Sequence, residues 1–139
     1  MKPQNITITM KVDTAIISGN PPSVWCTLSQ TGGGSITTVP GDSSQDVSTV
    51  LETDTITWAG SANVPPDQAT VNITSIQITS GTDPFGPKSA GTPGAYGTTI
   101  KATCITIETG AIYRINFSYN GTNYSLDPKI TVNAGSDEN

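Results

Sequence analysis

Apolar and polar residues alternate along most of this chain with the two-residue period of a β-strand. The stretch NITITMKV, residues 5–12, alternates in this way, and so does AIYRINFSY, residues 111–119. No segment of useful length shows the period of a helix. Together with the turn residues between them, these alternating runs predict the following strands: Asn5–Val12, Ala15–Ser18, Ser23–Gln30, Ser35–Val39, Val47–Leu51, Asp54–Trp58, Thr70–Thr79, Thr98–Thr109, Ala111–Tyr119, Thr122–Leu126 and Lys129–Val132.

Two of the predicted strands change phase midway. In one, the apolar positions move to the other face between Ile73 and Ile76, and in the other they do so between Cys104 and Ile105. Such a change indicates either a β-bulge or a strand that crosses between two packed sheets. Many short strands separated by Gly and Pro turns predict an all-β fold, a two-sheet antiparallel β-sandwich, with jelly-roll and immunoglobulin-like topologies both open.

The dipeptide Asn120-Gly121 lies between two alternating runs and is a strong signal for a two-residue hairpin turn. A type I′ turn needs positive φ at both central residues, which Asn tolerates and Gly prefers. A loop of this length sets the register, so we expect Phe117 to face Tyr124 across the hairpin.

One segment, SGTDPFGPKSAGTPGAYG at residues 80–97, is too rich in Gly and Pro for a strand. Connections of this length are uncommon in compact domains and often carry function. We therefore expect it to be the main recognition loop, with Asp83, Phe85 and Tyr96 as candidate contacts. Residues 1–139 are expected to form one β-sandwich domain that includes this loop and ends in a short acidic tail at residues 134–139.

Composition and charge narrow the classes of function. Only 12% of the residues are charged, the formal net charge is −5, and there is no histidine. An acidic chain lacks the basic patch that nucleic-acid binding requires, and no apolar run is long enough to span a membrane. Without histidine the Ser-His-Asp and Cys-His arrangements are excluded. We therefore expect a non-enzymatic protein without metal or cofactor. Because the N-terminal residues lack the apolar core of a signal peptide, we expect the protein in the cytoplasm or exported without a cleavable signal peptide.

The two cysteines allow two interpretations. Cys26 and Cys104 both have apolar neighbours, so they are either buried free thiols or the two halves of a disulfide between the sheets. The two tryptophans are interpreted from the phase of their strands. Trp58 shares a face with Ile56 and is expected in the core. Trp25 falls on the opposite face from Cys26, so it is either exposed as a contact residue or, if that phase is inverted, part of the core.

Several short motifs resemble the bacterial inclusion-body protein family (PixA/AidA-like). They are DTITW at residues 54–58, ATVNITSIQ at 69–77, YRINF at 113–117 and YSLDPKITV at 124–132. The resemblance implies a small cytoplasmic β-sandwich that accumulates or associates with itself, and it implies no catalytic residues.

Two functions from different classes follow. The first is a non-catalytic structural protein that forms inclusions or filaments as a homo-oligomer or polymer, in which case residues 5–12 are expected to be an edge strand open to a second copy. The alternative is a lectin-like carbohydrate-binding module, with Trp25, Asp83, Phe85, Tyr96 and Asn123 as candidate contacts.

Overall fold

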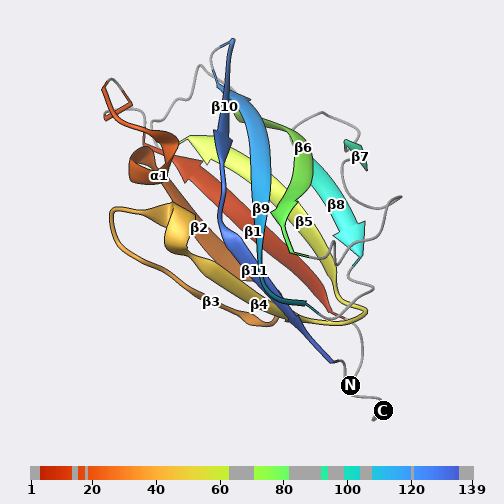
Figure 1. Cartoon of the computed structure of the whole chain (residues 1–139). Helices are drawn as coiled ribbons and strands as arrows, with labels where there is room; N and C mark the ends of the chain where they lie inside the picture. The colour runs from red at the N-terminus through yellow and green to blue at the C-terminus, as the bar shows by residue number, and fades with distance from the viewer. Residues whose placement is uncertain are drawn as a thin grey trace.

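The computed structural model of the chain describes residues 4–13, 16–17, 19–62, 71–81, 92–93, 99–103, 108–119 and 121–134. These residues are mostly in strands, which lie in two sheets stacked face to face (Figure 1). The elements are β1 (Asn5–Val12), α1 (Pro22–Trp25), β2 (Cys26–Thr31), β3 (Ser35–Thr37), the 3-10 turn η1 (Ser43–Gln45), β4 (Val47–Leu51), β5 (Thr55–Ala62), β6 (Val71–Ser80), β7 (Thr92–Pro93), β8 (Thr99–Thr103), β9 (Glu108–Tyr119), β10 (Thr122–Leu126) and β11 (Lys129–Asn133).

The first sheet has the strand order β2-β1-β5-β8-β7. In the second, β10 and β11 pair with successive parts of one edge of β9, β6 pairs with its other edge, and β4 and β3 follow beyond β11. The predicted all-β sandwich is confirmed. Its sheets are mixed, however, because β1 runs parallel to β5 and β4 runs parallel to β11. The expectation of purely antiparallel sheets is therefore wrong in this detail, since strand direction depends on which distant strands become neighbours.

The core lies between the sheets and is built by the alternation that the sequence displays. On β1 the residues Ile6, Ile8, Met10 and Val12 are all buried, while the residues between them are partly or fully exposed. The same pattern holds on β9, where Tyr113 and its alternate neighbours are buried. Burial of this apolar surface is the main favourable term in folding.

The hairpin at the C-terminal end is confirmed in its register. β10 pairs antiparallel with β9 so that Phe117 faces Tyr124, and Thr122 faces Tyr119. Gly121 has a φ of +79°, the conformation that the turn requires. The two rings of Phe117 and Tyr124 stack with centroids 5.6 Å apart.

The phase change in β6 is a β-bulge. The pairing of β6 with β9 shifts register between Ile73 and Ser75, so that Val71, Ile73 and Ile76 are all buried. At the second predicted phase change the chain passes from β8, in the first sheet, to β9, in the second. Residues 104–107 themselves lie outside the described residues.

Four expectations about individual segments are wrong. The first strand, β1, is not an edge, because β2 and β5 pair with its two sides. Residues 16 and 17, inside the predicted strand Ala15–Ser18, belong to no strand. The predicted strand Ser23–Gln30 begins instead as the short helix α1 and becomes extended only at Cys26. Within the predicted loop 80–97, Thr92–Pro93 forms the short strand β7 beside β8.

Candidate functional site: an uncharged side of the sandwich with a small pocket

One side of the sandwich is built from a segment without any charged residue. Residues 14–41 contain no Asp, Glu, Lys or Arg, although the chain has eleven acidic and six basic residues in all. Their described part forms α1, β2, β3 and the connections around them, on the left of Figure 1. We call the surface of residues 16–17 and 19–41 the neutral side.

The folding of this segment follows from its local sequence. Pro22 stands at the start of α1, where its missing N–H costs nothing, and Cys26 ends the helix in an extended conformation. After β2, the residues Gly32, Gly33 and Gly34 all have positive φ. This backbone conformation, which other residues rarely adopt, carries the chain from β2 in one sheet to β3 in the other.

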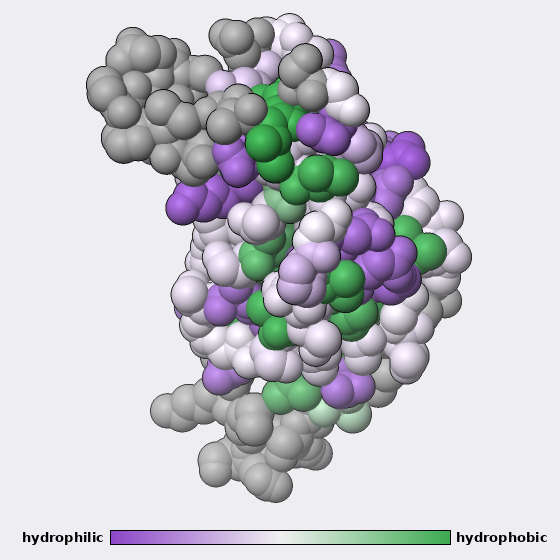
Figure 2. All heavy atoms as spheres, turned by 90° about the vertical axis from the view of Figure 1, so that its left-hand side faces the viewer, coloured by the Kyte–Doolittle hydropathy of each residue, from purple (hydrophilic) through white to green (hydrophobic). Residues whose placement is uncertain are grey.

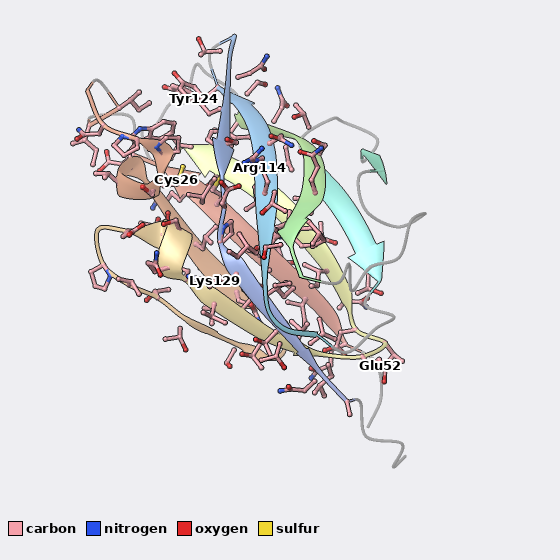
Figure 3. All side chains as sticks on the ribbon, in the orientation of Figure 1. Cys26, Glu52, Arg114, Tyr124 and Lys129 are labelled. Atoms are coloured by element: carbon pink, nitrogen blue, oxygen red, sulfur yellow. The ribbon has the colours of Figure 1, made fainter. Side chains whose placement is uncertain are left out.

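The neutral side holds the most exposed apolar residues of the described structure. The large hydrophobic residues with at least 36% of their surface exposed are Ile16, Val24 and Val39, and all three belong to it. Figure 2 looks at this side of the molecule, where apolar atoms reach the surface in several places among pale, weakly polar atoms and patches of strongly hydrophilic ones. The charged residues labelled in Figure 3, Glu52, Arg114 and Lys129, belong to the turn after β4, to β9 and to β11.

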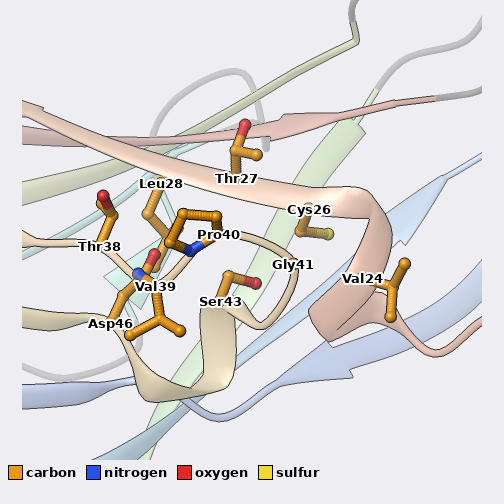
Figure 4. Close-up of a pocket in the computed structure, with 10 residues that line it drawn as sticks. All are labelled: Val24, Cys26, Thr27, Leu28, Thr38, Val39, Pro40, Gly41, Ser43 and Asp46. Carbon is orange, nitrogen blue, oxygen red and sulfur yellow. The ribbon is translucent and has the colours of Figure 1, made fainter.

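A pocket of about 170 Å³ opens on the neutral side. It lies between β2 and the connection from β3 to β4, as Figure 4 shows. Its apolar lining comes from Val24, Leu28, Val39 and Pro40. The other lining residues are Cys26, Thr27, Thr38, Gly41, Ser43 and Asp46.

Asp46 is the buried carboxylate of the pocket, and its hydrogen bonds hold the connection from β3 to β4 in place. One of its carboxylate oxygens accepts a hydrogen bond of 2.7 Å from the N–H of Val39, and its carbonyl oxygen accepts one of 2.9 Å from the N–H of Lys129. Burial raises the pKa of the Asp46 carboxyl, although the bond from Val39 lowers it and the charge of Asp42 raises it further. Asp46 therefore fixes the loop against β11.

Cys26 lies at the floor of the pocket as a buried free thiol. Burial raises its pKa to about 12, so the thiol stays neutral and weakly nucleophilic at physiological pH. Cys104 lies outside the described residues, but the free thiol of Cys26 means that the predicted disulfide between the two is not formed.

Trp25 is not a surface contact. Only 1% of it is exposed, its ring meets those of Phe117 and Tyr124 edge to face at 6.0 and 5.0 Å, and its indole N–H donates to the carbonyl oxygen of Asn20 at 2.8 Å. The exposed alternative is wrong because the helical turn α1 places Trp25 and Cys26 both inward, which a continuous strand could not do.

The remaining predicted contact residues do not meet at one place. Asn123 is exposed on β10, whereas Asp83, Phe85 and Tyr96 lie outside the described residues. None of the residues predicted as contacts pointed to the neutral side as a whole. Its signal was nevertheless present, because the absence of charge between Asp13 and Asp42 can be counted in the sequence.

The part of the chain that the structure describes offers neither a metal-binding cluster nor a membrane-spanning helix. There, no group of three or more His, Cys, Asp or Glu residues is placed to hold a metal ion. None of the helices found there has the length and apolar character needed to cross a bilayer.

Comparison with known proteins gives a match in structure alone. No family model matches the chain, and no curated protein is significantly similar to it in sequence. The chain is similar in structure to an inclusion body protein (PixA) from Burkholderia cenocepacia J2315, known from a crystal structure, with a TM-score of 0.70 and 12% sequence identity. The match covers 95% of this chain and 96% of that one. The resemblance to the inclusion-body family is thus confirmed at the level of the fold.

Proposed function

We propose that this chain is a non-catalytic β-sandwich that works by associating with itself, as a structural protein that forms inclusions or filaments in the cytoplasm. The observation that carries the proposal is the similarity in structure, over nearly the whole length of both chains, to a protein described as an inclusion body protein. The sequence motifs in β5, β6, β9, β10 and β11 point independently to the same family.

Association between copies must use a route other than β1, because β1 is covered on both sides. The net charge of −5 opposes close approach of two copies. Salt screens this repulsion beyond about 8 Å at 150 mM ionic strength, so association should strengthen as salt is added.

Sedimentation velocity at several protein and salt concentrations tests the proposal. We expect species larger than the 14.4 kDa monomer, in amounts that grow with both concentrations. A single 14.4 kDa species at millimolar protein and high salt would overturn it. In that case a glycan array tests the carbohydrate-binding alternative, which rests on Asn123 and on residues of the 80–97 segment.

A further inference from the structure

The distribution of charge restricts where a second copy can dock. All eleven acidic and six basic residues lie outside residues 14–41, so the net charge of −5 belongs entirely to other parts of the surface. A charged residue in a contact between two copies loses its hydration, and this cost is offset only where a residue of opposite charge lies at the matching position of the other copy. The neutral side carries no such penalty.

β2 is the last strand of the first sheet, and its outer edge lies on the neutral side beside the connection from β3 to β4. The N–H of Asp13 donates to the carbonyl oxygen of Trp25 at 2.8 Å. In an antiparallel pair, every second residue of a strand bonds to its neighbour. Counting from Trp25, the N–H and C=O groups of Leu28 and Gln30 on β2 therefore point away from β1. Among the described residues none forms a hydrogen bond with these outward groups.

Natural edge strands are usually guarded by lysine, by proline or by a bulge. β2 has the sequence CTLSQT and pairs with β1 in an uninterrupted register, so it has none of these guards. Beside this edge are the pocket and the exposed side chains of Val24 and Val39. The site therefore combines a strand edge that pairs with no further described strand and exposed apolar side chains, and the charged residue that lines its pocket, Asp46, is only 2% exposed.

We propose that the neutral side docks a second copy of this chain, so that the neutral sides of two copies face each other and cover the pocket. This inference rests on the proposed function and names the surface that performs it. A two-fold contact of this kind uses the same patch on both copies, which suits a patch that is free of like-charge repulsion against itself.

The test introduces a charge on the neutral side without disturbing the core. Val24→Lys replaces a side chain that is 36% exposed and changes the net charge from −5 to −4. A smaller net charge weakens the general repulsion between copies and would favour non-specific association. The proposal predicts instead that Val24→Lys weakens association. Ser80→Lys is the matched control, because it makes the same change of net charge at an exposed residue of β6, which pairs with β9 far from β3 in the sheet order.

We expect Val24→Lys to raise the protein concentration needed for half-maximal association by about tenfold or more, because the contact then buries an unpaired ammonium group on each copy. Val39→Lys should act in the same direction, and Ser80→Lys should associate at least as well as the wild type. Where the two Val24 side chains lie close to the two-fold axis, an equal mixture of Val24→Lys and Val24→Glu should regain association, because opposite charges then meet. Melting temperatures close to that of the wild type confirm that each variant is folded.

The outcomes separate the two proposals. A wild-type chain that stays monomeric overturns the proposed function and this inference together. A wild type that associates, with Val24→Lys and Val39→Lys associating equally well, overturns the docking surface alone. Loss of association in both lysine variants, with Ser80→Lys unaffected, supports the docking surface, and recovery in the lysine–glutamate mixture places the two Val24 side chains close together near the two-fold axis.

Discussion

The indole N–H of Trp58 donates a hydrogen bond of 3.1 Å to the hydroxyl oxygen of Tyr113, and the bond joins the two sheets through the core. Trp58 lies on β5 and Tyr113 on β9, both rings are almost completely buried, and their centroids are 5.7 Å apart. A polar contact at this depth both stabilises the sandwich and sets how the sheets lie on each other.

Tyr113→Phe keeps the ring and removes the oxygen that accepts the bond from Trp58. We expect the free energy of unfolding to fall by about 1–2 kcal/mol, because a buried donor then loses a hydrogen bond. Urea denaturation measures the change. Tyr119→Phe removes a hydroxyl from a partly exposed ring on the same strand and should cost much less. Equal effects of the two variants would show that the bond between the sheets contributes nothing special.

Gly121→Val places a β-branched residue where φ is +79°. We expect a loss of about 1 kcal/mol or more, since a β-branched residue resists positive φ. Thr122→Val, at the next residue, lies in a strand that tolerates valine and serves as the control. A melting temperature of Gly121→Val that equals that of the wild type would contradict the turn conformation.

Trp25→Ala should destabilise the fold by about 3–5 kcal/mol, because it leaves a cavity beside Phe117 and Tyr124. Val24→Ala, one residue away but exposed, should change stability by only about 0.5 kcal/mol. Chemical denaturation of both variants measures the contrast. Comparable losses would mean that α1 does not divide the two side chains between core and surface as described.

The thiol of Cys26 should make stability depend on alkaline pH. Its pKa rises from 9.0 to about 12 on burial, so between these pH values the unfolded chain has lost a proton that the folded chain still holds. The folded state binds more protons there, and the free energy of unfolding therefore falls as pH rises. Cys26→Ala should lose less stability than the wild type between pH 8 and pH 10. The same loss in both proteins would exclude a contribution from this thiol.

The local sequence determined where most strands lie and which of their residues face inward. The bounds of β1, β4 and β10 agree with the alternation, the bulge in β6 follows the phase change after Ile73, and Asn120-Gly121 sets the register of the hairpin. These features could be predicted because they depend on neighbouring residues, through the two-residue period of a strand and the φ angles that a tight turn requires.

Tertiary structure alone decided which strands are neighbours, and with that the character of each edge. The residues NITITMKV do not indicate that β5, some fifty residues later, pairs parallel with β1 along the edge that β2 leaves unpaired. The inward position of Trp25 depends on packing against Phe117 and Tyr124, which lie about a hundred residues away in the chain. The absence of charge in residues 14–41 is visible in the sequence, but only the fold gathers that segment on one side of the sandwich. Pairing between distant strands comes from long-range contacts, and a local pattern of polar and apolar residues does not encode them.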